Sequence, residues 1–308
     1  MEIKNTAIVG AGALGVMFGS HIARTLGRDR VVFVADEERI ARYRAEGIYC
    51  NGEREDFRYA VCGDSSEQAD LVIFATKYMA LSQAIEEIRA QVHPNTVFIS
   101  LINGIVSEEE IGRAYGADRV IGCIAQEMDS VKRGNQFFYN SMGVLVIGNF
   151  GGVRDEKLAA LESFLDEAGI CYRESQNIEY DMWNKLMFNT GINQISAVFD
   201  LTYGGVAADE KASGTMAAAM EEARAVAASR GIILGEEEIP RWMEVLRRLT
   251  PDSMPSMRQD TLAGRPTEVE LFAGTLRRIG RENGVPTPVN DWLYEQIRAI
   301  EERNRRRV

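Results

Sequence analysis

Three polar side chains recur at a fixed spacing inside an apolar stretch in the middle of the chain. Lys185, Asn189 and Asn193 stand four residues apart in the run 182–199, where Lys185 is the only charged residue. On a helix with 3.6 residues per turn, this spacing places the three side chains on one face. A buried ammonium group and two buried amides need hydrogen-bond partners. The helix therefore either pairs them internally or presents them to a cleft that binds a polar ligand.

Few other residues could carry acid–base or metal chemistry. There are two histidines, His21 and His93, in unrelated contexts, and four cysteines without a C-x-x-C pair. A Ser-His-Asp triad and a zinc site are therefore not expected, no metal is predicted, and a general acid would have to be a lysine or a carboxylate. The cysteines indicate small buried side chains in a reducing compartment. They are Cys50, Cys62, Cys123 and Cys171.

A glycine-rich motif stands near the start of the chain. Gly10, Gly12 and Gly15 form G-x-G-x-x-G between a short β-type run at 6–9 and a helical pattern that reaches about residue 26. The first glycine permits a tight turn, the second lets the backbone approach a pyrophosphate, and the third lets the helix pack closely on the strand. The N-terminus of the helix then offers free N–H groups to phosphates. We therefore predict a dinucleotide site at Gly10, Ala11, Gly12, Ala13, Leu14 and Gly15.

Polar residues follow three apolar runs that are typical of buried parallel strands. Asp36 follows the run 31–35, Lys77 follows 71–75, and Asn103 with Gly104 follows 97–101. In an open α/β sheet, ligands bind at the carboxyl ends of the strands. Lys77 is therefore placed to meet the cofactor or an anionic substrate.

Asp36 bears on the choice of cofactor. An acidic residue about 20 positions after the glycines accepts hydrogen bonds from both hydroxyls of the adenosine ribose and repels a 2′-phosphate, which favours NAD(H) over NADP(H). The alternative is that Asp36 caps a helix that starts at residue 37. Arg39 and Arg42 lie close by and could receive a phosphate.

Strand and helix patterns alternate up to about residue 175. After the runs above we expect a helix at 79–91, a strand at 120–124, an antiparallel hairpin of 136–139 with 144–147, a helix at 154–168 and a strand at 171–173. Such alternation predicts a Rossmann-type doubly wound α/β sheet, which we assign to a domain of residues 1–175.

From residue 176 to 308 we predict an all-α domain. Helical periods cover 182–199, 209–230, 236–249, 267–283 and 289–303, and the basic run 303–307 fits a solvated helix end. The connection 255–268 is dense in polar groups. Thr267 with Glu270 three residues later predicts a capping box, which would place Glu268 in the first turn of its helix.

The composition is that of an ordinary soluble globular protein. The 308 residues carry a formal net charge of -11 at pH 7, and the pI is about 4.9. This acidic balance argues against nucleic acid and anionic membrane surfaces as partners. The apolar segment 8–23 resembles a signal peptide, but its glycine spacing has a better explanation and no basic segment precedes it, so we expect a cytoplasmic protein.

Several motifs in register resemble the ketopantoate reductase (2-dehydropantoate 2-reductase) family. The match covers nearly the whole chain in order. It rests on the glycine motif 10–15, Lys77, Asn103-Gly104, the segment 183–186 with Asn189 and Asn193, the segment 256–260 and the segment 265–268, and the segment 284–288 resembles the family's ending.

This resemblance implies an enzyme with its active site between a Rossmann domain and a helical domain, which reduces 2-dehydropantoate to (R)-pantoate with NADPH. By the family pattern the catalytic residues are Lys185, as the general acid, and Glu268, which helps hold the cofactor or the substrate. Partial burial would lower the pKa of Lys185 toward the working pH, and its ammonium group would stabilise a developing alkoxide. Asn189, Asn193 and Ser256 would bind the substrate. Asn103 would lie where nicotinamide and substrate meet.

Departures from the family pattern leave alternatives open. Asp36 stands where the family usually has a basic residue, and Gln194 stands where proline usually follows the position of Asn193. A related 2-hydroxyacid dehydrogenase that acts on another branched 2-oxo acid is therefore an alternative. A non-catalytic dinucleotide sensor is a further one, although a sensor need not keep Lys185, Asn189, Ser256 and Glu268 together. The apolar C-terminal helices favour a homodimer.

Overall fold

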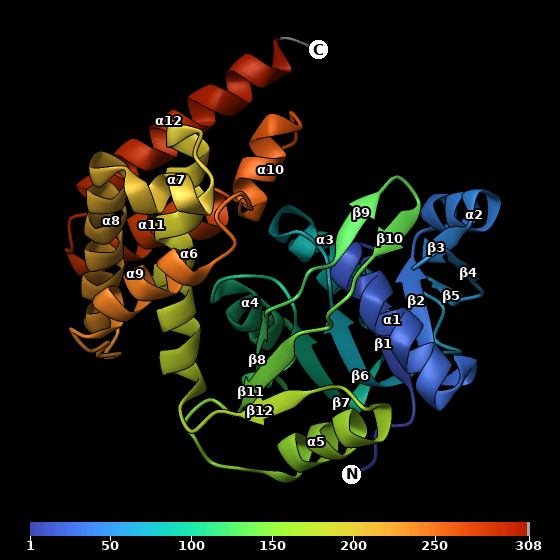
Figure 1. Ribbon diagram of the computed structural model, residues 1–308. Helices are drawn as coiled ribbons and strands as arrows, with labels where there is room; N and C mark the ends of the chain where they lie inside the picture. Colours follow the sequence, from blue (N-terminus) through green and yellow to red (C-terminus); the bar gives the residue numbers. More distant parts are fainter. Residues whose placement is uncertain (307–308) are drawn as a thin grey trace. The chain divides into compact units, whose positions relative to one another are not determined.

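The computed structural model describes residues 1–306, which form two compact units (Figure 1). We call Met1–Asn103 with Ser107–Ile178 the sheet unit, and Gly104–Val106 with residues 179–306 the helical unit. Arg307, at the end of the expected basic run, lies outside the described residues.

A five-stranded parallel sheet with helices forms the centre of the sheet unit, which confirms the predicted α/β class. Its strand order is β5-β2-β1-β6-β7. The strands are β1 (Thr6–Val9), β2 (Val31–Ala35), β5 (Arg58–Val61), β6 (Ala69–Phe74) and β7 (Val92–Ser100). β1 and β2 are buried along their whole length, as continuous apolar runs require when both faces of a sheet are covered.

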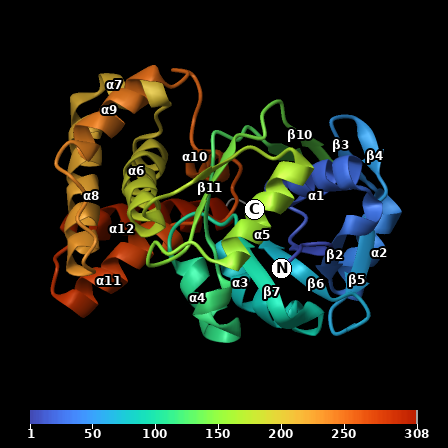
Figure 2. The same ribbon diagram turned by 90° about the horizontal axis from the view of Figure 1, so that it is seen from below.

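Helices cover both faces of this sheet (Figures 1 and 2). Side chains of α1 (Ala13–Leu26) and α5 (Glu156–Ala168) share one core with alternate residues of the central strands. On the other face Phe98 stacks on Tyr115 of α4 (Val106–Tyr115), with ring centroids 4.8 Å apart. The Tyr115 hydroxyl donates to the carbonyl of Ile85 in α3 (Leu81–Glu87). The helix expected at 79–91 is shorter, because 3₁₀ turns at Tyr78–Ala80 and Arg89–Gln91 flank α3.

Two smaller sheets complete the unit, and they show that the expected hairpin is wrong. β10 (Gln136–Phe138) pairs antiparallel with β9 (Val131–Arg133) and parallel with β3 (Ile48–Cys50), next to β4 (Glu53–Glu55). β11 (Val144–Gly148) pairs instead with β8 (Gly122–Gln126) and β12 (Tyr172–Glu174).

The chain between β10 and β11 is a connector rather than a hairpin turn. Asp129 accepts hydrogen bonds from the amides of Asn140 and Ser141, at 2.9 and 2.8 Å, and so holds this segment. The tight turn lies earlier, at Gly134, whose φ of 62° is readily adopted by glycine.

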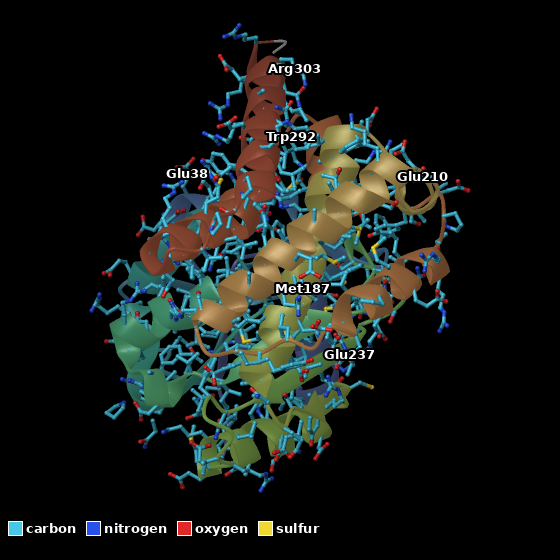
Figure 3. All side chains as sticks on the ribbon, turned by 90° about the vertical axis from the view of Figure 1, so that its left-hand side faces the viewer. Glu38, Met187, Glu210, Glu237, Trp292 and Arg303 are labelled. Carbon is cyan, nitrogen blue, oxygen red and sulfur yellow. The ribbon has the colours of Figure 1, made fainter. Side chains whose placement is uncertain are left out.

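The helical unit contains all five helices that the periodicity predicted, and two short ones that it missed. The structure has α6 (Ile178–Phe199), α7 (Tyr203–Ala208), α8 (Glu210–Ser229), α9 (Glu238–Arg248), α10 (Ser256–Leu262), α11 (Thr275–Asn283) and α12 (Pro288–Arg305). Figure 3 labels Met187 on α6 and Trp292 on α12. Gly191 lets α8 approach α6, because a Cβ there would lie 2.9 Å from the side chain of Met216.

The capping box expected at Thr267 and Glu270 is wrong. Both the amide and the hydroxyl of Thr267 donate to Oε1 of Glu301 on α12, at 2.8 and 2.7 Å. The helix begins later, with a π turn at Glu270–Gly274, so Glu268 precedes it instead of lying in its first turn. The buried carboxylate of Glu301, on a distant helix, takes the role that was expected for Glu270.

Two further expectations concern the environment of the chain. Cys50 and Cys123 are buried, but Cys62 is only partly buried and Cys171 is exposed, so the expectation of four buried thiols is wrong. Within residues 1–306, no helix combines the length and the apolar character needed to cross a membrane.

Candidate active site

The glycine loop joins β1 to α1 in a space too small for side chains. Gly10 has a φ of 107°, and a Cβ atom added there would lie 2.7 Å from the carbonyl carbon of Ala75. A Cβ added at Gly15 would lie 2.0 Å from the carbonyl oxygen of Gly10. Strand, turn and helix can therefore pack this closely only with glycine at both positions.

The N-terminus of α1 suits an anion. Its N-cap, Gly12, offers no side-chain cap, and the first turn holds no acidic residue. The first intrahelical bond runs from the amide of Val16 to the Gly12 carbonyl, at 3.0 Å, which leaves the amides of residues 13–15 without intrahelical acceptors. The positive end of the helix dipole then favours phosphate.

Thr76 is a polar residue at this loop that the sequence did not single out. It lies two positions after β6, and its Cγ2 would be 2.9 Å from a Cβ added at Gly10. Its hydroxyl is buried and has no hydrogen-bond partner in the described part of the chain. A buried unpaired hydroxyl beside a side-chain-free cradle fits a polar cofactor at this loop. Its place after a buried strand was the one available signal.

Asp36 caps α2 (Glu37–Glu46) and also fixes Arg39. Its Oδ1 accepts from the Arg39 amide at 2.6 Å, and its Oδ2 accepts from Arg39 Nε at 2.6 Å. The hydrogen bond from the Arg39 amide, followed by that from its guanidinium, lowers the pKa of Asp36 below its usual value. Arg39 Nη2 also pairs with Glu87, which is largely buried. The guanidinium is therefore held between two carboxylates.

Lys77 and Asn103 also follow strands of the five-stranded sheet. Lys77 is exposed and precedes the 3₁₀ turn Tyr78–Ala80 after β6, and Asn103 is partly buried after β7. Together with Gly10 and Asp36 they lie beyond the carboxyl ends of parallel strands, as the sequence predicted. The sheet unit thus carries the expected cofactor residues except Glu268, which belongs to the helical unit.

The polar stripe of Lys185, Asn189 and Asn193 lies on α6. Successive members rise about 6 Å along the helix axis. Lys185 and Asn189 are partly exposed, whereas Asn193 is 5% exposed. Within residues 1–306, the Asn189 side chain and the Nδ2 of Asn193 have no hydrogen-bond partner. The stripe therefore has amide groups left over for a polar ligand.

Ser256 is brought to this stripe at the start of α10. Its Oγ donates to Oδ1 of Asn193 at 3.2 Å, and the amide of Met257 donates to the same oxygen at 3.3 Å. The Asn193 amide is thereby held in one orientation.

Glu268 lies further along the chain, just before the π turn, and is partly buried. Its backbone carbonyl accepts from the amides of Leu271 and Phe272.

A buried network on the far side of α6 was not foreseen from the sequence. Asn184 Nδ2 donates to Glu238 at 2.8 Å, and Trp242 Nε1 donates to Asn184 Oδ1 at 2.6 Å. Trp242 also stacks on Phe188, with ring centroids 4.3 Å apart. These contacts attach α6 to α9 and fix its rotation next to Lys185. The partners are more than 50 positions apart in sequence, so no local pattern marks them.

Comparison with known proteins agrees with this geometry. Residues 6–152 match the family model described as ketopantoate reductase PanE/ApbA, and residues 177–301 match its C-terminal model. A 2-dehydropantoate 2-reductase of Archaeoglobus fulgidus is 27% identical over 301 residues, which covers 98% of this chain and 99% of the relative.

Solved structures show the same fold over nearly the full length. A ternary structure of D-mandelate dehydrogenase with NADH and anilino(oxo)acetate has a TM-score of 0.85 and 25% identity, covering 98% of this chain and 99% of that one. A 2-dehydropantoate 2-reductase from Methylococcus capsulatus has a TM-score of 0.82 and 26% identity, covering 97% of each chain. The chain therefore belongs to the ketopantoate reductase family and is an NAD(P)-dependent oxidoreductase.

Proposed function

We propose that this enzyme reduces the 2-oxo group of 2-dehydropantoate to give (R)-pantoate, a step of pantothenate biosynthesis. The observation that carries the proposal is the stripe of Lys185, Asn189 and Asn193 on α6, with Ser256 bonded to Asn193. It occurs in a chain that matches both family models. The stripe supplies one ammonium group and amide donors for a substrate that has a ketone, a carboxylate and a hydroxyl.

Reduction of a ketone needs a hydride at carbon and a proton at oxygen. The nicotinamide cofactor supplies the hydride when it is bound. Lys185 Nζ gives the proton to the carbonyl oxygen, and its positive charge stabilises the alkoxide as it develops. Asn193 Nδ2 is available to the substrate because its Oδ1 is engaged by Ser256 and Met257.

Further residues hold the reactants in this proposal. Asn189 donates to the substrate carboxylate or hydroxyl, and Ser256 Oγ accepts from the substrate hydroxyl while it donates to Asn193. Glu268 helps to hold cofactor or substrate, and Asn103 positions the substrate beside the nicotinamide. The loop from Gly10 to Gly15 binds the pyrophosphate, and Lys77 binds an anionic group of the cofactor.

We further propose that NADH is the preferred cofactor. A 2′-phosphate would meet the negative charges of Asp36 and Glu87, and Arg39 is already paired with both. The carboxylate of Asp36 keeps lone pairs for the ribose hydroxyls, because a carboxylate has about four acceptor sites and two are used.

Steady-state oxidation of NADH and of NADPH with 2-dehydropantoate, measured side by side, tests both proposals. We expect turnover with both cofactors and a higher kcat/KM with NADH. A strong preference for NADPH would retain the substrate and remove Asp36 as the selector. No turnover with either cofactor would reject 2-dehydropantoate as the substrate.

A second candidate is reduction of another branched 2-oxo acid. The likeness to D-mandelate dehydrogenase over 98% of this chain favours it. So does Gln194 on α6, which stands where the family usually has proline and whose amide donates to the carbonyl of Thr190 at 2.8 Å. A panel of aliphatic and aromatic 2-oxo acids in the same assay separates the two candidates by kcat/KM. A protein that binds the cofactor and reduces none of them would be a sensor.

We also propose a cytoplasmic homodimer formed through the helical unit. Large apolar side chains are exposed there, with Ile233 at 70%, Leu262 at 59% and Trp292 at 40%. Light scattering coupled to size exclusion should give about twice the chain mass of 34.3 kDa. A mass equal to one chain at micromolar concentration would reject the dimer.

A further inference from the structure

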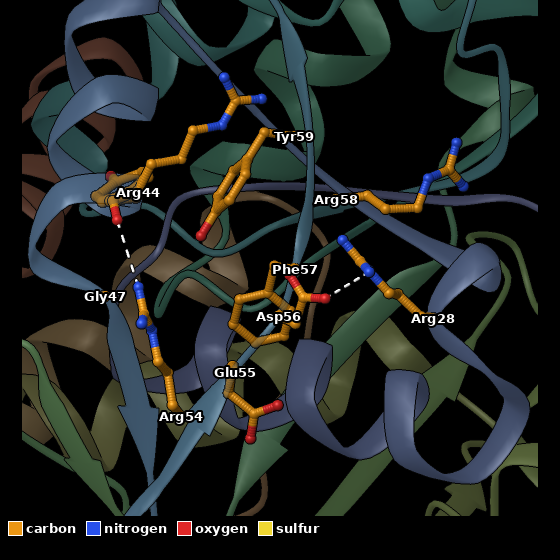
Figure 4. Close-up of a pocket in the computed structure, with 10 residues that line it drawn as sticks. Arg28, Arg44, Gly47, Arg54, Glu55, Asp56, Phe57, Arg58 and Tyr59 are labelled. Atoms are coloured by element: carbon orange, nitrogen blue, oxygen red, sulfur yellow. Dashed lines mark hydrogen bonds and ion pairs between the residues drawn. The ribbon is translucent and has the colours of Figure 1, made fainter.

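A pocket of about 630 Å³ lies in the sheet unit, at the amino ends of β2 and β5 (Figure 4). The end of α2, the segment 54–59 and Arg28 form its wall. The glycine loop and Asp36 follow the carboxyl ends of β1 and β2. The pocket therefore lies at the opposite end of the strands from the proposed cofactor site and is separate from it.

The lining of this pocket carries uncompensated positive charge. Arg28 pairs with Asp56, and Arg58 pairs with Glu67. Arg44 and Arg54 also line the pocket, and neither has a carboxylate partner anywhere in residues 1–306. In a chain with a net charge of -11, two arginines without counter-ions at one cavity mark a local anion site.

The one remaining carboxylate of the lining does not neutralise these arginines. Glu55 accepts from Ser20 at 2.6 Å and pairs with Arg24, and its side chain is 8% exposed. In Figure 4 its carboxylate points away from Arg44 and Tyr59. The positive charge of Arg44 and Arg54 is therefore available to a ligand.

Aromatic rings and one hydroxyl complete the pocket. Tyr43 and Tyr59 lie 6.0 Å apart between ring centroids, and Phe57 is buried beside them. The Arg44 guanidinium lies 5.8 Å from the Tyr59 ring centroid. The Tyr59 hydroxyl has no hydrogen-bond partner among the described residues, and Figure 4 shows it pointing toward the side where Arg54 and Phe57 lie. Burial raises the pKa of Tyr59 to about 12, so this group is a donor at neutral pH.

We propose that this pocket binds a phosphorylated ligand with a planar ring, of the nucleoside monophosphate class. The phosphate accepts hydrogen bonds from Arg54 and the Tyr59 hydroxyl, since guanidinium groups match phosphate oxygens in geometry and charge, and Arg44 beside the Tyr59 ring adds positive charge. The planar ring packs against Tyr43 and Phe57. A volume of about 630 Å³ is within the usual range for small-molecule sites.

Equilibrium dialysis of AMP against the full-length protein tests this assignment. NADH and NADPH are present in excess, so that AMP does not report on the dinucleotide site. We expect saturable binding of AMP at one site per chain. Arg54→Ala should weaken it by about tenfold or more, as loss of a charge-assisted hydrogen bond does, and Arg44→Ala should weaken it severalfold by removing a nearby positive charge. Tyr59→Phe should weaken it severalfold.

Arg113→Ala is the matched control, because Arg113 is an exposed arginine of the same unit that pairs with Glu109. It should bind AMP like the unaltered protein. The rate of NADH oxidation with 2-dehydropantoate should be unchanged in the three pocket variants and in the control, which shows that all four fold.

Four results would overturn the assignment. One is the absence of saturable AMP binding. Another is binding that survives in the double variant Arg44→Ala/Arg54→Ala, which would place AMP elsewhere. Equal affinity for inorganic phosphate would remove the planar ring from the proposal, and equal affinity for adenosine would remove the phosphate.

Discussion

The Lys185 side chain is partly exposed, and its backbone position on α6 is fixed. It lies on α6 directly after Asn184, whose amide is held by Glu238 and Trp242. A proton donor has to reach one substrate oxygen at hydrogen-bond distance, so a helix that cannot rotate serves it better than a loop. The network behind α6 therefore has a positioning role in the proposed reaction.

Replacing Lys185 tests its proposed role directly. Lys185→Ala should lower kcat by about a hundredfold or more, which is the usual contribution of a general acid, and should leave NADH affinity within about twofold. Stopped-flow turnover and fluorescence titration of NADH measure the two quantities. Lys211→Ala, at an exposed position of α8, is the control and should behave like the unaltered enzyme. An unchanged kcat would exclude Lys185 from the mechanism.

Cofactor preference should respond to Glu87 as well as to Asp36. Glu87→Gln removes one of the two negative charges on Arg39 and leaves its guanidinium freer to meet a 2′-phosphate. We expect the ratio of kcat/KM for NADPH to that for NADH to rise about tenfold, and to rise further in Asp36→Arg. Glu86→Gln, at an exposed neighbour, is the control. A ratio that stays constant in both variants would place cofactor selection elsewhere.

The pH dependence of NADH binding follows from the lowered pKa of Asp36. Because the pKa of Asp36 lies below its ordinary value of 3.8, the carboxylate is fully charged well above that pH and contributes to NADH binding there. It loses this contribution only as the pH falls through the lowered pKa. The contribution of Asp36 should therefore be constant from pH 8 down to pH 5. Titrations of the enzyme and of Asp36→Asn across this range should give parallel curves. Curves that converge within it would show that Asp36 titrates there.

At the scale of elements, Glu301 connects α12 to the segment that carries Glu268. Its Oε1 accepts from the amide and the hydroxyl of Thr267. Glu301→Ala should lower the free energy of unfolding by about 1–3 kcal/mol, because a buried amide and a buried hydroxyl lose their acceptor. Urea denaturation measures this change, and Glu302→Ala, at an exposed position, should change it by less than about 0.5 kcal/mol. Equal effects of the two would contradict the contact.

The elements that the sequence predicted well are those with strong local patterns. Buried strands such as 31–35 and the apolar stretch around Lys185 are visible because burial on all sides leaves a continuous apolar run. The three-residue strands β3, β4 and β9 carry no such run. β4 and β9 pair with the neighbouring strands β3 and β10, but the sheet that holds them forms only where β3 meets the distant β10, so tertiary pairing decided where they form. The pairing of Thr267 with Glu301 escaped prediction for the same reason, because its partner is 34 positions away.

The candidate site was predictable in part on the same grounds. The glycine loop and the stripe on α6 are fixed spacings within one segment. Thr76 and the network of Asn184, Glu238 and Trp242 depend on which distant segments pack together. The spacing of residues within one segment does not predict that packing. The sequence allowed two interpretations of Asp36, as a helix cap and as a ribose ligand. The structure shows the cap and leaves the ribose contact as a proposal.

At the scale of the whole molecule, net charge governs behaviour in solution. The chain carries a formal charge of -11 at pH 7 and has a pI of about 4.9. We expect a solubility minimum near pH 5, where electrostatic repulsion between molecules vanishes. Static light scattering from pH 4 to pH 8 measures it. A second virial coefficient that stays positive through pH 5 would show that repulsion does not control association.

The pairing of β10 with β3 has a consequence for how the chain acquires its fold. The side chain of Asn51, next to β3, accepts from the amide of Tyr139, next to β10, across 88 positions. Closing so long a loop costs entropy before any contact is gained, and non-local pairing of this kind slows folding. During synthesis, β3 has to wait for residues 136–138 to leave the ribosome. We therefore expect the four-stranded sheet to be completed late, after the residues of β1, β2 and β6 have been synthesised.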